Sequence, residues 1–274
     1  MIPLVDLLRR RVEPNEAASF SPREPDGTRD PERWWGNHLA EMRWQAELAR
    51  LLVDPVYRGE GVPRGDGAPV IAIPGFLAGD ASLWVMRDWL RRLGYAPHES
   101  EMHVNVACSD RALDRLERLA DRLHAQTGRR VALIGHSRGG HFAKALAHRR
   151  PECVSAVISL GAGLDEPFAI SIPTQAALGA LRSVYARTSD RVARNGCLTA
   201  TCRCRFTHDF SAPFPEEVPL TSIYSEGDGV VRWQACVVPY ARCVPVMGSH
   251  VGLAYNRQAY RVLADTLAAH AVGV

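Results

Sequence analysis

The chain has 274 residues, of which 46% are hydrophobic and 23% are charged. This length and balance are typical of a soluble globular protein and predict one large domain with a sizeable core. The formal net charge is only +3 and the arginines are scattered along the chain, so a nucleic-acid partner is not expected.

No uninterrupted apolar run approaches the roughly 20 residues that a membrane-spanning helix needs, so we expect no integral membrane segment. The first residues, Met1 to Arg11, lack the charged start, apolar centre and small-residue cleavage site of a secretory signal. We therefore expect a cytoplasmic location, or a secreted one if a leader segment has been removed.

Residues 1–66 are predicted to form an N-terminal extension that packs on or wraps the core. Residues 1–32 are polar and interrupted by prolines, which disfavours any long regular element. A helix is predicted from Pro31 to Leu52, and its apolar residues recur at three- and four-residue steps: Trp35, Leu39, Met42, Ala46 and Ala49. We expect this stripe to pack on the core. The alternative is an exposed apolar edge that contacts lipid or another protein.

Strands and helices alternate in the domain predicted at residues 67–274. The first strands are expected at Val70–Ile73, within Tyr95–Val106, at Val131–Ile134 and at Val154–Leu160, and the first helices at Asp80–Leu93 and Ser109–Thr127. Gly94 and Gly128 are expected to end these two helices. Such alternation is typical of a parallel sheet that is covered on both faces, and it predicts an α/β fold.

The pentapeptide Gly135-His136-Ser137-Arg138-Gly139 lies between a buried strand and a predicted helix. A G-x-S-x-G sequence in this setting is a nucleophile elbow, a sharp turn that lifts the serine hydroxyl above the sheet beside the positive end of the helix dipole. A plain glycine turn or a phosphate-binding loop is the alternative, but the flanking strand and helix favour Ser137 as a nucleophile. We expect His136 to point away from the serine's side of the turn.

The stretch at about 165–218 is longer than a simple crossover between strands, and it contains a predicted helix at Gln175–Arg187. We interpret it as an insertion over Ser137, and a surface excursion with no role is the alternative.

Cysteines are dense in and after this insertion: Cys197, Cys202, Cys204, Cys236 and Cys243. Free thiols are favoured. A disulfide joining Cys202 or Cys204 to Cys236 is a second interpretation. A metal site formed by Cys197, Cys202, Cys204 and His208 is a third, although its spacing is not that of the usual zinc sites.

Acidic residues and one histidine follow the last predicted strands. Asp228 lies in a tight loop after a strand at Pro219–Tyr224, and Glu226 in that loop and Asp165 after the preceding strand compete with it. A final strand at Cys243–Met247 precedes His250, and a helix at Asn256–Ala269 ends the domain. Of the ten histidines, only His250 lies in a loop past the last strand and after the acid.

Three segments resemble the α/β-hydrolase superfamily, and within it bacterial esterases and lipases: Ile73 to Phe76, Gly135 to Gly140, and Tyr224 to Val231 together with Gly248-Ser249-His250. The resemblance covers about Pro69 to the C-terminus. It implies an α/β-hydrolase fold with a mostly parallel central sheet flanked by helices, and a cap or lid formed by the insertion at about 165–218.

The resemblance also implies site residues. The triad follows the order serine, acid, histidine, which favours Asp228 over Glu226 and Asp165 as the acid. The backbone N–H groups of Phe76 and Arg138 form the oxyanion hole by the same resemblance. Pro74 stands where lipases commonly have histidine, but the donor is the amide two residues later.

These features predict a serine carboxylic ester hydrolase, an esterase or lipase, that acts on uncharged acyl esters through an acyl-enzyme. Ser137 would be the nucleophile, His250 the base and Asp228 the acid that orients it. No cofactor and no metal are expected, and the binding partner is a small-molecule or lipid ester. The alternatives are an acyltransferase or amidase that uses the same triad, and a non-catalytic binding protein on this scaffold.

Overall fold

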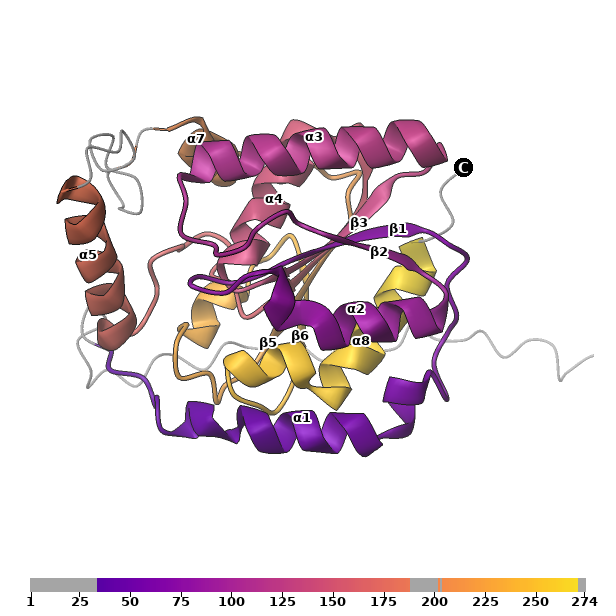
Figure 1. Cartoon of the computed structure of the whole chain (residues 1–274), viewed down its shortest axis with the longest axis horizontal. Coiled ribbons are helices and arrows are strands. Elements are labelled where there is room, and N and C mark those ends of the chain that lie inside the picture. The colour runs from indigo at the N-terminus through magenta and orange to yellow at the C-terminus, as the bar shows by residue number, and fades with distance from the viewer. Residues whose placement is uncertain (1–33, 188–201, 203, 271–274) are drawn as a thin grey trace, which may run out of the picture. The chain divides into compact units, whose positions relative to one another are not determined.

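The computed structural model describes residues 34–187, 202 and 204–270, and Figure 1 shows how their elements are arranged. The strands are β1 (Pro69–Ile73), β2 (Ala96–Glu99), β3 (Val131–His136), β4 (Val154–Leu160), β5 (Leu220–Tyr224) and β6 (Arg242–Pro245). The helices are α1 (Trp44–Val53), α2 (Trp84–Leu93), α3 (Ser109–Thr127), α4 (Arg138–Arg149), α5 (Ile172–Arg187), α7 (Arg205–Ser211) and α8 (Arg257–His270). Short 3-10 turns include η2 (Ala40–Arg43), η3 (Pro55–Arg58), η4 (Asp80–Leu83), η5 (Pro151–Cys153), η6 (Trp233–Cys236) and η7 (Val251–Tyr255).

Within the described residues, one six-stranded sheet has the order β2-β1-β3-β4-β5-β6, and every neighbouring pair is parallel. The register pairs Ile73 of β1 with Gly135 of β3, and Gly135 with Ser159 of β4. The C-terminal ends of these strands therefore meet at one edge of the sheet. β1, β4 and β5 are buried along their whole length, as expected for a sheet that is covered on both faces. The predicted parallel sheet is confirmed.

Helices cover both faces of this sheet. α3 and α4 lie on one face, and α1, α2 and α8 lie on the other (Figure 1). Leu116 and Phe142 belong to the core of the first face. Trp89 and Tyr260 belong to the core of the second, with ring centroids 4.5 Å apart. Burial of each large apolar side chain contributes about 2 kcal/mol to stability, so two well-packed layers hold the sheet edge in place.

Glycines end two of the helices, as predicted. Gly94 follows α2 with a φ of 94°, and Gly128 follows α3 with a φ of 66°. Both values lie in the left-handed region that stops a helix and that glycine adopts without steric cost. No helix in the described part of the chain combines the length and the apolar character that crossing a bilayer requires.

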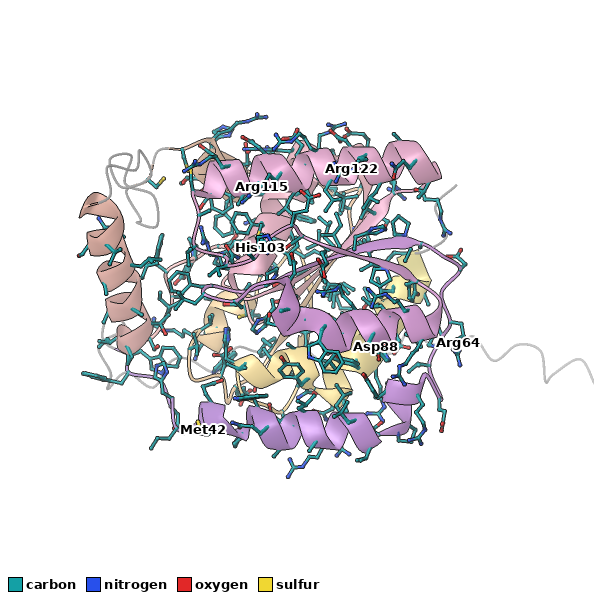
Figure 2. The ribbon with its side chains drawn as sticks, in the orientation of Figure 1. Met42, Arg64, Asp88, His103, Arg115 and Arg122 are labelled. Atoms are coloured by element: carbon teal, nitrogen blue, oxygen red, sulfur yellow. The ribbon has the colours of Figure 1, made fainter. Side chains whose placement is uncertain are left out.

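The helix predicted at Pro31–Leu52 differs from the structure in its start and in its orientation. The structure has η2 followed by α1, and the predicted apolar stripe faces outward: Trp35 is 67%, Leu39 87% and Met42 65% exposed. Met42 is labelled in Figure 2. The inward face instead carries Leu51, which is fully buried, and Glu41, which is 8% exposed. The expectation that the stripe packs on the core is therefore wrong, because hydrogen bonds made by Glu41 set the orientation.

The long insertion lies between β4 and β5. Its described part contains α5, seen at the left of Figure 1, and α7, while residues 188–201 and 203 lie outside the described residues. α7 packs on α4, the helix that follows Ser137. The ring centroids of Phe206 and Phe142 are 5.2 Å apart, and Arg149 of α4 forms an ion pair with Asp209 of α7. The insertion is therefore joined to the element that carries the elbow.

Candidate active site

Ser137 lies in a sharp turn between β3 and α4, as the elbow motif predicts. Its backbone has φ 52° and ψ −124°, which is a strained conformation for a residue with a side chain. The turn needs its glycines because the backbone approaches itself closely. A Cβ on Gly135 would lie 2.4 Å from the carbonyl of Gly139, and a Cβ on Gly139 would lie 2.1 Å from the carbonyl oxygen of Ile73. The sequence thus dictates this turn locally.

His250 and Asp228 meet beside this turn. His250 Nδ1 lies 2.6 Å from Asp228 Oδ2, and both side chains are buried. The other carboxylate oxygen accepts hydrogen bonds from the backbone N–H groups of Val230 and Val231, at 2.8 and 2.7 Å. The carboxylate is therefore fixed by its own loop. Since Nδ1 faces Asp228, it is the opposite ring nitrogen, Nε2, that is left for other chemistry.

Ser137 and His250 line the same cavity, together with Phe76 and Arg138. Within the described residues, neither the Ser137 hydroxyl nor His250 Nε2 has a hydrogen-bond partner. The structure therefore brings four of the five predicted site residues to one cavity and joins the fifth, Asp228, to it through His250.

Opposing effects act on the proton of His250. Burial disfavours the charged ring, but the charge of Asp228 and its hydrogen bond favour it, with a further contribution from Glu41. The net result raises the pKa of His250 above its ordinary value. The site is thus suited to holding an imidazolium when one forms.

His136 was expected to point away from the serine, and this is wrong. Its Nε2 lies 2.9 Å from the carbonyl oxygen of His250, and the two ring centroids are 4.9 Å apart. Because a carbonyl oxygen only accepts, His136 Nε2 is the donor. Burial, and then the nearby charge of His250, lower the pKa of His136 to about 4, so the ring is neutral near pH 7. His136 therefore helps to hold the loop that carries His250, through its hydrogen bond to the backbone of that loop.

The loop after β1 passes directly against the elbow. A Cβ on Gly75 would lie 3.1 Å from Ser137 Cβ, so a side chain there would press against the turn, and glycine fits this close approach best. Asn105 Nδ2 donates to the carbonyl of Pro74 at 2.8 Å and fixes this loop. Asn105 is a supporting residue that the sequence did not single out, because no motif surrounds it.

The Arg138 side chain also contacts Asn105. Its guanidinium donates to the carbonyl and the side-chain oxygen of Asn105, both at 3.0 Å, and to the hydroxyl of Ser109 at 3.0 Å. Arg138 is the first residue of α4. Its side chain thus holds the neighbouring loops in place.

The two competing acids take other positions. Asp165 accepts a hydrogen bond from Lys144 Nζ at 2.9 Å and another from the Tyr240 hydroxyl. Glu226 is exposed. Of the three acids, Asp228 is the one that contacts His250.

A cavity of about 690 Å³ opens in front of Ser137. Its walls come from the loops at the sheet edge and from the insertion, and its apolar lining includes Leu77, Leu83, Phe168, Ile170, Leu178 and Phe210. The volume lies in the range of small-molecule sites, and the apolar walls fit a hydrocarbon group.

The described cysteines are free thiols. Cys202 and Cys204 pack with Cys108, whereas Cys236 and Cys243 share a separate cluster, so the bridge considered between the first pair and Cys236 is absent. Cys197, which the metal-site interpretation needs, lies outside the described residues. Among the residues that are described, no group of three or more His, Cys, Asp and Glu side chains could hold a metal ion.

No protein-family model matches the sequence, and no curated protein matches it. Solved structures are similar in fold. An α/β-hydrolase enzyme from the metagenome of sediments from the lagoon of Mar Chica, Morocco, is 20% identical with a TM-score of 0.51, over 75% of this chain and 93% of that chain. A Bacillus licheniformis lipase in mature form is 15% identical with a TM-score of 0.51, over 76% of this chain and 94% of that chain.

A third similar structure is a meta-cleavage product hydrolase from Pseudomonas fluorescens. It is 18% identical with a TM-score of 0.51, over 75% of this chain and 92% of that chain. Structural similarity at identities this low shows a shared fold and no more. It confirms the fold that the three sequence segments implied. The chain therefore has the α/β-hydrolase fold.

Proposed function

We propose that this protein is a serine hydrolase that cleaves carboxylic esters of uncharged acyl groups. The observation that carries the proposal is the 2.6 Å contact between Asp228 Oδ2 and His250 Nδ1, which leaves Nε2 of a buried ring available in the cavity that Ser137 lines. A buried carboxylate that orients a histidine near a strained serine is the arrangement that activates a hydroxyl nucleophile.

In the proposed reaction, Ser137 Oγ attacks the ester carbonyl carbon and its proton passes to His250 Nε2. The Phe76 and Arg138 N–H groups stabilise the oxyanion, each by about 3 kcal/mol. The intermediate collapses, the carbon–oxygen bond to the alcohol breaks, and His250 returns the proton to the leaving alcohol. Water then attacks the carbonyl carbon of the acyl-enzyme and gives a proton to His250. The bond between that carbon and Ser137 Oγ breaks, His250 returns the proton to Oγ, and the acid leaves.

The substrate class is inferred from the cavity. Apolar side chains from the insertion, such as Leu178 of α5 and Phe210 of α7, line it and would contact the acyl chain. We propose that the insertion acts as a cap that shapes this pocket and excludes water. The similar structures include a lipase and a meta-cleavage product hydrolase, so the fold alone is compatible with more than one reaction.

A fluorophosphonate probe tests the nucleophile directly. We expect the folded protein to be labelled at Ser137, and we expect Ser137→Ala to abolish labelling. Folded protein that takes no label would favour a non-catalytic binding protein instead.

A series of nitrophenyl esters of increasing acyl length tests the reaction and separates an esterase from a lipase. Labelling without ester hydrolysis would favour an acyltransferase or an amidase, which acyl-acceptor and amide substrates would then distinguish.

A further inference from the structure

Glu41 connects the two loops that carry the proposed base and acid. It lies in η2, near the start of the described residues, and is 8% exposed. Its Oε1 accepts hydrogen bonds from the backbone N–H groups of Gly229, at 2.8 Å, and His250, at 2.9 Å. Its Oε2 accepts from the N–H of Val251 at 2.9 Å. One carboxylate thus holds the residue after Asp228 and the backbone of His250 itself.

Glu47 anchors the same histidine loop one residue earlier. Its carboxylate lies 3.0 Å from the N–H of Ser249 and 2.9 Å from the Ser249 hydroxyl. The fit is close, because a Cβ on Gly252 would lie 1.2 Å from Glu47 Oε2. Two glutamates of one helical segment therefore accept from three consecutive amides. Only Glu41 also reaches the acid loop.

The charge of Glu41 is compensated by dipoles. It forms no ion pair with any described residue, and its oxygens face amide N–H groups. Three N–H dipoles offset the cost of burying this carboxylate, but they do not cancel its negative charge. The proposed reaction creates a positive charge on His250 in each half of the cycle, which this negative charge would stabilise.

Several ionisable groups face His250 from different elements. Asp228 follows β5, Glu41 comes from η2, and both favour the charged ring. His136 of β3 opposes it if protonated, but burial keeps His136 neutral near pH 7. Glu47 of α1 contacts the preceding residue, Ser249, and does not touch His250.

We propose that Glu41 is a positioning residue that locks the acid loop to the histidine loop and supplies a second negative charge beside His250. This inference rests on the proposed hydrolase function. It assigns a role in the site to the N-terminal segment, which lies outside the part of the chain that resembles hydrolases in sequence. The carboxylate of Glu41 is the essential feature, because an amide cannot accept at all three N–H groups and carries no charge.

The test compares Glu41→Gln with the matched control Glu47→Gln. Both remove a charge from the same segment and weaken the anchoring of the same loop. We expect Glu41→Gln to lower kcat/KM for a nitrophenyl ester by about 10- to 100-fold, mainly through kcat, because the base is misplaced. The control should lose clearly less.

The pH dependence of kcat/KM shows whether Glu41 acts on His250 through its charge or has a merely structural role. The base must be neutral to accept a proton, so kcat/KM rises with pH through the pKa of His250. Removing a negative charge lowers this pKa, so the acid limb should move to lower pH by at least about 0.5 pH unit in Glu41→Gln. Glu47→Gln should shift it less, and Glu41→Asp, which keeps the charge, should restore most of the limb.

NMR titration of the His250 ring gives the same pKa without requiring activity. It therefore separates two failures. If wild-type protein takes no fluorophosphonate label but the ring pKa still falls in Glu41→Gln, the hydrolase proposal fails and the electrostatic role of Glu41 stands. If labelling is normal and the acid limb and kcat/KM of Glu41→Gln equal those of Glu47→Gln, the role of Glu41 is overturned.

Amide hydrogen exchange on the wild-type protein covers the case in which Glu41→Gln does not fold. The proposal requires slow exchange at the amides of Gly229, His250 and Val251, since each donates to a buried carboxylate. Exchange at these amides as fast as at exposed loop positions overturns it without any variant.

Discussion

Ser137 and His250 face one cavity but are held there by different means. Ser137 is fixed by its own backbone: a strand, a strained turn and a helix follow each other within a few residues, and Gly135 and Gly139 permit the close packing. His250 lies in a loop whose amides are held by carboxylates from a distant segment. The position of Ser137 therefore depends mainly on the backbone of its own turn, packed against β1 and β4, whereas the position of His250 depends on side chains from a distant segment. Substitutions at the Ser137 turn and substitutions at the contacts of the His250 loop should therefore have separable effects on stability and activity.

The largest expected effect comes from removing the reacting groups themselves. Ser137→Ala and His250→Ala should each lower kcat for ester hydrolysis by at least about a thousandfold, because each abolishes proton transfer from nucleophile to base. The double variant should be little worse than either single one, since the two groups act as a unit. Steady-state kinetics with a nitrophenyl ester measure this, and additive losses would contradict a shared role.

Removing the orienting acid should have the next largest effect. Asp228→Asn should lower kcat by at least about a hundredfold, because His250 would lose the charge that fixes its tautomer. Asp165→Asn is the comparison, since Asp165 bonds to Lys144 and Tyr240, and it should cost far less activity. A harmless Asp228→Asn together with a crippling Asp165→Asn would transfer the role to Asp165.

The elbow can be broken without touching a reacting group. Gly139→Ala would place a Cβ 2.1 Å from the Ile73 carbonyl oxygen, and we expect a loss of at least about 2 kcal/mol in the free energy of unfolding. Gly179→Ala in α5 is the matched control: Gly179 also lies in a helix without positive φ, but a Cβ there would meet nothing within 4 Å, so no loss is expected. Urea denaturation measures both values, and equal losses would mean that close packing at the turn matters little.

The smallest effect is a shift along the pH axis in the unmodified protein. Asp228 and Glu41 outweigh burial and raise the pKa of His250 above 6.5. Its ring therefore stays protonated to higher pH than the ring of an ordinary histidine. A protonated base is inactive, so kcat/KM should fall as pH decreases through a midpoint above 6.5. A pH–rate profile checks this, and a midpoint below 6.5 would show that burial outweighs the carboxylates.

The sheet and the elbow could be predicted from the sequence because their signals are local. Alternating buried strands and amphipathic helices predicted the parallel sheet, and a five-residue pattern predicted the strained turn at Ser137. The histidine of the last loop was found by its order in the chain, and the structure joins it to Asp228. The catalytic roles of these residues stay predictions until activity is measured.

The N-terminal segment could not be predicted in the same way. An apolar stripe indicates which side chains can be buried, but it does not indicate which distant amides need acceptors. Glu41 and His250 are 209 positions apart, so no local pattern links them. Here hydrogen bonds to three loop amides outweighed the stripe, and Trp35, Leu39 and Met42 face outward. The orientation of His136 was missed for a related reason, because its partner is the carbonyl of His250.

The acceptors at positions 41 and 47 also affect where this protein can be cut. A truncation just ahead of β1 would keep every strand, the turn at Ser137 and Asp228. It would nevertheless expose the amides of residues 249 to 251 to water and release the imidazole from its support. Such a shortened protein should retain its sheet and the turn at Ser137, but its His250 would no longer be firmly placed.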